Sequence, residues 1–165
     1  MHATIGIYDD HELAVAAVKE LKESGYPLAQ LSIMGKAETE VLDEDLHTMP
    51  KEPIANAGVK VGTTTAIGTA LGILTGVGLF AIPGIGVLYG AGALVGAIAG
   101  FDFGLMGGIA TIFATMGVKD ENAKKYHDAL AEGKFLVIAD GDEAAVIRAR
   151  KTLQEHDTHN DLSLH

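Results

Sequence analysis

The hydrophobic pattern divides the chain into two polar halves with one long uncharged stretch between them. From Val61 to Phe101, 41 consecutive residues include no Asp, Glu, Lys, Arg or His, and after Asp102 the uncharged run continues from Phe103 to Val118. About 20 apolar residues span a bilayer core as a helix, so the stretch is long enough for two crossings. The Ile82–Gly86 segment contains a proline and two glycines, which favour a turn near the middle.

This pattern predicts a helical hairpin. Its two arms are expected over about 62–82 and 86–101, and a shorter apolar helix is expected over about 103–117. Asp102 is the only formal charge among the 58 residues from 61 to 118. It either caps the start of the shorter helix, since aspartate is a good N-cap, or serves a proton or cation role, since carboxylates within a membrane are costly and often functional.

Glycines recur every four residues inside the stretch. The two tracks consist of Gly68, Gly72 and Gly76, and of Gly92, Gly96, Gly100, Gly104 and Gly108. This spacing places small residues on one helix face, where two backbones can approach closely. A glycine inside a helix costs about 1 kcal/mol relative to alanine, so a regular track indicates that close helix packing offsets the cost. The packing is expected either between the two hairpin arms or between subunits, where it could surround a pore.

The two polar halves carry the patterns of a small α/β domain. The first half predicts a strand over 3–8, a helix over 12–24 and a strand over 31–34. The second half predicts a polar helix over 119–132, a strand over 134–140, a helix over 144–154 and a short strand over 161–165.

The predicted fold class is therefore α+β, a ferredoxin-like split β-α-β sheet with an inserted glycine-rich hydrophobic helical hairpin. Four parts follow from this pattern: 1–36, the first half of the α/β domain; 37–60, an acidic linker; 61–118, the hairpin; and 119–165, the polar helix and second half. Because both halves contribute strands to one sheet, they must lie on the same side of any membrane. An even number of crossings satisfies this condition and places both termini on one side, which we expect to be the cytoplasm.

Composition excludes several classes of function. The chain has no cysteine, which rules out disulfides, thiol catalysis and zinc–thiolate sites, and its net charge of −10 argues against binding to nucleic acid. No phosphate-binding loop or nucleophile elbow is present. We therefore predict no catalytic residues, no cofactor and no cofactor-binding residues.

One group of side chains near the end of the sequence has the composition of a metal site. It consists of His156, Asp157, His159, Asp161 and His165. Histidines and carboxylates at close spacing can bind a divalent metal, but a polar segment explains the same residues. We predict no metal site here.

Three segments together resemble a known family. They are the Ile5–Asp10 strand end followed by an Ala/Val/Leu-rich helix that ends Glu23-Ser24-Gly25-Tyr26, the glycine-rich stretch, and the Phe135–Ile138 strand. This arrangement resembles bacterial general stress proteins, including the heat-induced stress protein domain. A similar plan, with two spans and a ferredoxin-like domain, occurs in a membrane subunit of alternative complex III. The resemblance supplies no catalytic residues and implies a non-enzymatic protein, and no haem attachment motif is present.

The leading hypothesis is a non-enzymatic, stress-associated structural protein. It forms a homo-oligomer through its glycine-rich hydrophobic hairpin in or on the cytoplasmic membrane, with membrane lipid or other hydrophobic molecules as its further partners. Two alternatives use the same subunit. In one, the protein is a cytoplasmic soluble assembly whose apolar interior holds lipid or hydrophobic cargo. In the other, it is a channel or transport component with Asp102 facing the path.

Overall fold

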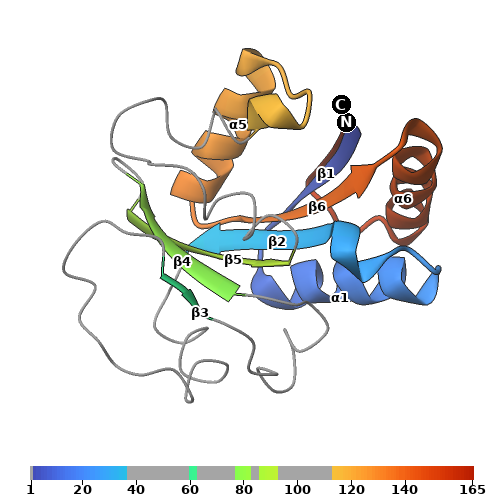
Figure 1. Ribbon diagram of the computed structural model, residues 1–165, viewed down its shortest axis with the longest axis horizontal. Coiled ribbons are helices and arrows are strands. Elements are labelled where there is room, and N and C mark those ends of the chain that lie inside the picture. The colour runs from blue at the N-terminus through green and yellow to red at the C-terminus, as the bar shows by residue number, and fades with distance from the viewer. Residues whose placement is uncertain (1, 37–59, 63–76, 83–85, 93–112) are drawn as a thin grey trace.

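The chain folds as a mixed α+β domain built on an antiparallel sheet (Figure 1). The computed structural model describes residues 2–36, 60–62, 77–82, 86–92 and 113–165. The strands within these residues are β1 (His2–Tyr8), β2 (Leu31–Lys36), β3 (Lys60–Gly62), β4 (Val77–Ile82), β5 (Gly86–Gly92), β6 (Phe135–Gly141) and β7 (Asp161–Leu164). The helices are α1 (His11–Glu23), the 3-10 turn η1 (Leu28–Gln30), α5 (Asp120–Ala131) and α6 (Glu143–His156).

The sheet joins both polar halves of the chain at its centre. Its strand order is β3-β4-β5-β2-β6-β1-β7, and every neighbouring pair is antiparallel. The longest pairing aligns β1 with β6, with Ile5 opposite Ile138. Strands β4 and β5 extend the sheet beyond β2, so they do not interrupt the four strands that the polar halves contribute.

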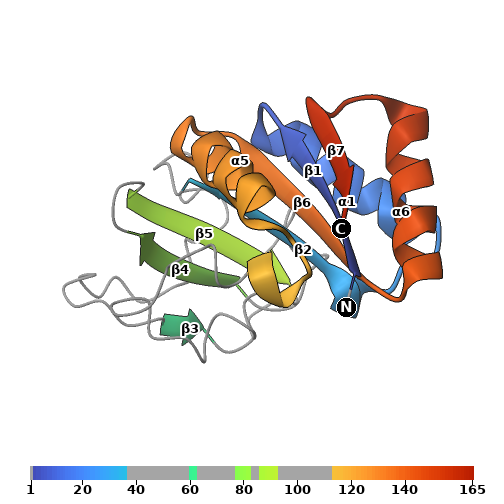
Figure 2. The same cartoon turned by 90° about the horizontal axis from the view of Figure 1, so that it is seen from above.

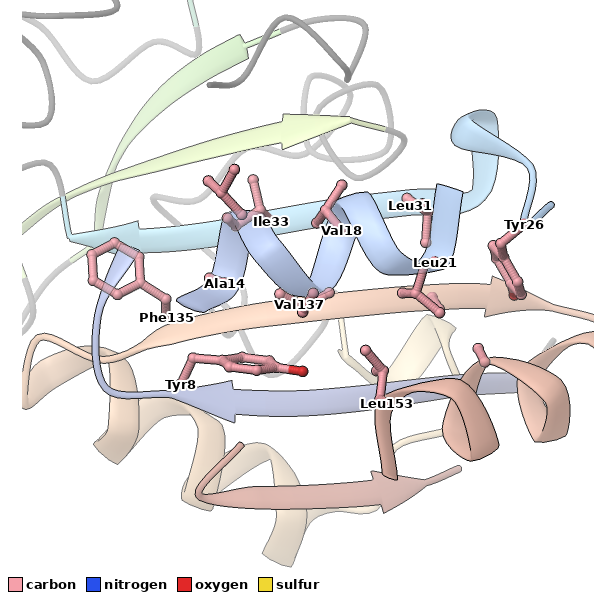
Figure 3. Packing of buried hydrophobic residues seen from close by; sticks show 14 of the residues in the cluster. Tyr8, Ala14, Val18, Leu21, Tyr26, Leu31, Ile33, Phe135, Val137 and Leu153 are labelled. Carbon is pink, nitrogen blue, oxygen red and sulfur yellow. The ribbon is translucent and has the colours of Figure 1, made fainter. Parts of the chain in front are cut away.

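The side chains of each strand alternate between the two faces of the sheet, so the core is divided into two clusters. Ile5 and Ile138 point to one face, where they pack with Tyr126 and Leu130 of α5. Val137 points to the other face, into a cluster that includes residues of α1 and α6 (Figure 3). Successive side chains of a strand point to opposite faces, so a nearly continuous apolar strand such as β6 serves both clusters. Figures 1 and 2 show α5 on one side of the sheet and α1 and α6 on the other.

Local sequence signals set the ends of the helices. The Asp10 side chain accepts a hydrogen bond from the Leu13 N–H at 2.9 Å, and the Asp142 side chain accepts one from the Ala145 N–H at 2.7 Å. Each aspartate thus satisfies an unpaired N–H at the start of its helix. Gly25 follows α1 with a φ of +85°, a conformation that glycine adopts without a steric penalty.

The predicted helical hairpin is wrong for the residues of it that the structure describes. Residues 77–82 and 86–92, which were expected to end one helical arm and begin the other, are the antiparallel strands β4 and β5. An unbroken apolar run has no period that separates a helix from a buried strand. Glycines lower helix propensity, and the free edge of β2 supplies hydrogen-bond partners, so the strand is the better solution here.

The strands and helices predicted for the two polar halves are confirmed, with ends that differ by a few residues. At the end of the apolar stretch, residues 113–115 are helical, as expected for the shorter apolar helix. The acidic linker over 37–60 and most of the hairpin over 61–118 lie outside the described residues, apart from the segments named above.

Candidate functional site

The apolar stretch is joined to the folded domain through the β2–β5 pair. Residues 32–36 of β2 pair with residues 92–88 of β5, from Ser32 opposite Gly92 to Lys36 opposite Leu88. Leu88 is fully buried and belongs to the cluster beneath α5. Phe113, near the far end of the stretch, is also fully buried there, and its ring lies 5.2 Å from that of Tyr126. The stretch therefore contributes to the core of the domain at both positions.

Gly92 of β5 lies close to the backbone of β2. Its φ is +98°, and a Cβ atom added to it would collide with the backbone carbonyl oxygen of Leu31. Gly92 is one of the eight glycines expected to pack two helices together. It does permit a close approach of two backbones, but the approach is between strands, so its assignment to a helix face is wrong. The other seven glycines, Gly68, Gly72, Gly76, Gly96, Gly100, Gly104 and Gly108, lie outside the described residues, as does Asp102.

The structure offers no support for a membrane-spanning helix in the part of the chain that it describes. None of the helices among these residues has both the length and the apolar character required to cross a bilayer.

A polar groove of about 500 Å³ lies between α5 and the end of the sheet at β7. Its lining residues are mostly charged: Ile7, Glu121, Lys124, Lys125, Asp128, Ala129, Glu132, Lys134, Asn160 and Asp161. The lysines of this groove already face carboxylates. Lys124 lies 2.6 Å from Asp128, Lys125 lies 2.5 Å from Asp161, and Lys134 lies 3.6 Å from Glu132 and 3.8 Å from Asp9. The groove therefore concentrates neither sign of charge.

A hydrogen-bond network connects α5 to β7 beside this groove. The Lys125 ammonium donates to Asp161 Oδ1 and, at 3.0 Å, to Ser163 Oγ, and the Ser163 hydroxyl donates to the same Asp161 oxygen at 2.9 Å. Burial disfavours the charged form of Asp161, but the hydrogen bonds from Lys125 and Ser163 outweigh it and lower the pKa of the carboxyl.

A second contact between α5 and the end of the chain involves Tyr126 and His165. The Tyr126 hydroxyl lies 2.6 Å from His165 Nε2, and the two rings meet edge to face. Burial raises the pKa of Tyr126 to about 12. Burial and repulsion by the Lys125 ammonium lower the pKa of His165, while the Asp161 carboxylate opposes that shift. The hydroxyl and the imidazole share one hydrogen bond, whose direction depends on the tautomer of His165.

The structure separates the five residues near the end of the sequence whose composition would suit a metal site. His156 lies 3.2 Å from Glu20 of α1, Asp161 binds Lys125, and His165 contacts Tyr126. Asp157 ends α6 in the left-handed conformation, with a φ of +47°. Nowhere in the described residues do three or more His, Asp or Glu side chains come together as metal ligands.

The Lys125–Ser163 pair has two of the groups of a serine–lysine catalytic centre, but its geometry is unsuited to that chemistry. A nucleophilic serine needs a neighbouring base that takes its proton. The ammonium of Lys125 is a donor with no acceptor capacity, and the Ser163 hydroxyl already donates to Asp161. The network therefore serves to hold β7 against α5.

Sequence reasoning missed Lys125, Tyr126 and Glu20 as partners of the terminal polar residues. Lys125 and Asp161 are 36 positions apart, and Tyr126 and His165 are 39 apart. Only the antiparallel pairing of β7 with β1 brings them together. No local spacing in the sequence signals these contacts.

Comparisons with known proteins identify no relative of this chain. No protein family, no curated protein and no solved structure matches the chain.

Proposed function

We propose that the chain is a non-enzymatic structural protein that self-associates through its glycine-rich uncharged stretch. The observation that carries the proposal is the separation of charge along the sequence: 41 residues from Val61 to Phe101 carry no charge in a chain whose net charge is −10. Burying such a surface is favourable by about 25 cal/mol per Å² of apolar area removed from water, whether the cover is lipid, cargo or another subunit.

The attachment of this stretch to the folded domain supports the proposal. β5 pairs with β2 along five residues, and Leu88 and Phe113 enter the core beneath α5. The uncharged stretch is thus fixed to a stable sheet at these places, which favours a defined assembly over the nonspecific association of a loose tail. The seven glycines outside the described residues would allow close contact between the associating backbones.

We propose that the strands β2, β6, β1 and β7, with α1 and α6, form a ferredoxin-like unit. The β-α-β order of each polar half and the strand order β2-β6-β1-β7 support this assignment. Its sequence features, with those of the glycine-rich stretch, resemble the bacterial general stress proteins, and the proposed association with stress rests on that resemblance.

The charge pairing in the polar groove supports a role without catalysis. Lys124, Lys125 and Lys134 each face a carboxylate, and the Ser163 hydroxyl is held by Asp161. The Lys125–Asp161 pair joins α5 to β7, and the Lys134–Asp9 pair joins the residue before β6 to the residue after β1.

Two locations are compatible with self-association of this kind: the cytoplasmic membrane, with both termini in the cytoplasm, and a large cytoplasmic particle with an apolar interior. We favour the membrane or its surface. Cell fractionation separates the two, because a membrane-associated protein floats with lipid vesicles and needs detergent for extraction. A particle remains in the soluble fraction without detergent and carries co-purifying lipid.

A channel or transport role for Asp102 predicts ion flux into liposomes that Asp102→Asn abolishes.

The Gly96→Leu substitution tests self-association through the glycine track directly. A leucine within a close-packed interface costs roughly 1–3 kcal/mol per subunit, so the native mass of the assembly should fall. Leu94→Ile, which keeps size and polarity, serves as the matched control and should leave the mass unchanged. An unchanged mass in Gly96→Leu would remove the glycine track from the interface.

A further inference from the structure

We propose that the free edge of β7 pairs with the same edge of a second copy of this chain, with the two-fold axis beside Ser163. β7 is the last strand of the described sheet on this side and pairs with β1 alone (Figure 2). A strand edge of this kind presents unpaired N–H and C=O groups to an incoming strand. This surface lies outside the glycine-rich stretch and is independent of it.

The hydrogen-bond register of β7 identifies the groups that face outward. Ala3 and His165 exchange both backbone hydrogen bonds, at 2.9 and 2.8 Å. Along an antiparallel pair such exchanging pairs alternate with pairs that make no direct bond. Leu164, opposite Thr4, and Leu162, opposite Gly6, therefore direct their N–H and C=O groups away from β1. These two residues supply the donors and acceptors of the open edge.

The sequence of the edge is complementary to itself when it is read antiparallel about Ser163. Leu162 then lies opposite Leu164 of the second copy and exchanges both hydrogen bonds with it. Asp161 lies opposite the imidazole-bearing His165, and Ser163 lies opposite Ser163. The pairing thus places leucine opposite leucine and the Asp161 carboxylate opposite the His165 imidazole. Both copies present the same surface, as a two-fold symmetric interface requires.

The exposed apolar side chains of the described residues support a partner at this edge. Leu164 is 38% exposed and Ile147 is 49% exposed, and they are the large hydrophobic residues that the folded domain leaves open there. Both lie near the contact between β1 and α6. Leu164 is opposite Thr4, and the Thr4 hydroxyl donates a hydrogen bond to the carbonyl of Val146, the residue before Ile147, at 2.7 Å. A second copy would cover this pair with its own Leu162–Leu164 edge. Because five paired residues form a small interface, we expect a weak, concentration-dependent dimer.

Single-cysteine variants test the register, because the natural chain contains no cysteine. In the proposed dimer the two Ser163 residues form a pair without direct hydrogen bonds, in which Cα atoms are about 4.5 Å apart, within the range of a disulfide. The matched control is Leu164→Cys, whose position is more exposed but lies opposite Leu162 and too far from its own copy to bridge. Under mild oxidation in detergent, Ser163→Cys should form covalent dimers at least about tenfold faster than Leu164→Cys.

Detergent separates this proposal from the proposed function, because it disperses association through the apolar stretch and leaves strand pairing intact. Equal rates for the two variants, or faster dimer formation by Leu164→Cys, would overturn the proposed pairing. Pairing with a different protein would also give no covalent dimer of Ser163→Cys. Hydrogen exchange of the unmodified chain provides a second measurement that needs no substitution. The Leu164 amide should exchange more slowly as the protein concentration rises, and exchange that is independent of concentration would contradict the dimer.

Discussion

The ring of Phe135 on β6 lies directly over Gly35 on the neighbouring strand β2, in the space that any other residue would fill with its Cβ atom. A similar relationship occurs on β1, where a Cβ atom at Gly6 would lie 2.8 Å from Cε2 of the Tyr8 ring. Both rings belong to the cluster that α1 and α6 cover. Glycine within a strand usually weakens it, and here an aromatic side chain fills the space instead.

Gly35→Ala should destabilise the domain by roughly 1–3 kcal/mol, because the added methyl group overlaps the Phe135 ring and forces it to move. Urea denaturation measures the change as a lower midpoint. Phe135→Leu in the Gly35→Ala background should cost less than in the natural chain, because the smaller side chain leaves room for the methyl group. Strictly additive losses in this double-mutant cycle would show that the ring and the glycine do not interact.

Gly92→Ala should weaken the attachment of β5 to β2. The alanine would occupy a left-handed conformation, at a cost of about 1–2 kcal/mol, and its methyl group would meet the Leu31 carbonyl. Hydrogen exchange should therefore accelerate at those amides of β2 that face β5, while the amides between β1 and β6 remain protected. Equal acceleration across the whole sheet would indicate global destabilisation instead of detachment.

The Lys125–Asp161 pair should stabilise the fold in a pH-dependent way. The pKa of Asp161 is lower in the folded protein than its ordinary value of 3.8, so the pair contributes fully above that value and its contribution is lost as pH falls through the folded pKa. Because both side chains are partly exposed, at 36% and 42%, the expected contribution is about 1 kcal/mol or less. Lys125→Met should reduce stability at pH 7, and the difference from the natural chain should shrink below pH 4. A difference that persists at low pH would trace the effect to packing.

His165 should titrate below the ordinary histidine value of 6.5, because its pKa is lowered by burial and by the Lys125 ammonium. A lowered pKa means that the folded state prefers the neutral imidazole, so this contribution to stability is present above pH 6.5 and is lost as pH falls through the folded pKa. The ring resonances of His165 in an NMR titration provide the measurement. In Tyr126→Phe the imidazole loses its hydrogen-bond partner, and the domain should lose about 1 kcal/mol at pH 7. Titration of His165 at or above 6.5 would contradict the effects of burial and of the Lys125 ammonium on this imidazole.

Much of the domain follows from local sequence. The alternation of Ile5 and Ile7 predicts β1, and Asp10 and Asp142 precede their helices as N-caps. These signals act over a few residues, so they can be recognised without knowledge of the fold. The β-α-β order of the two polar halves also predicted that β1 and β6 belong to one sheet, where they are direct neighbours.

The apolar stretch was harder to predict, because its composition is compatible with both helix and strand. Val77–Ile82 and Gly86–Gly92 carry no polar residue that would define a period of 3.6 or of 2. The decision between them is made by the free edge of β2, which is distant in sequence. The same limit applies to the contacts of Lys125 and Tyr126, because their partners Asp161 and His165 are brought near only through the pairing of β7 with β1.

The mass of the full chain in solution, measured with and without detergent, tests self-association through the uncharged stretch most directly. A single chain has a mass of 17.2 kDa. The account predicts particles of many chains in detergent-free buffer, and in detergent a small species of one or two chains with bound detergent. A mass of 17.2 kDa in detergent-free buffer across the accessible concentration range, with no change on adding detergent or lipid vesicles, would contradict it.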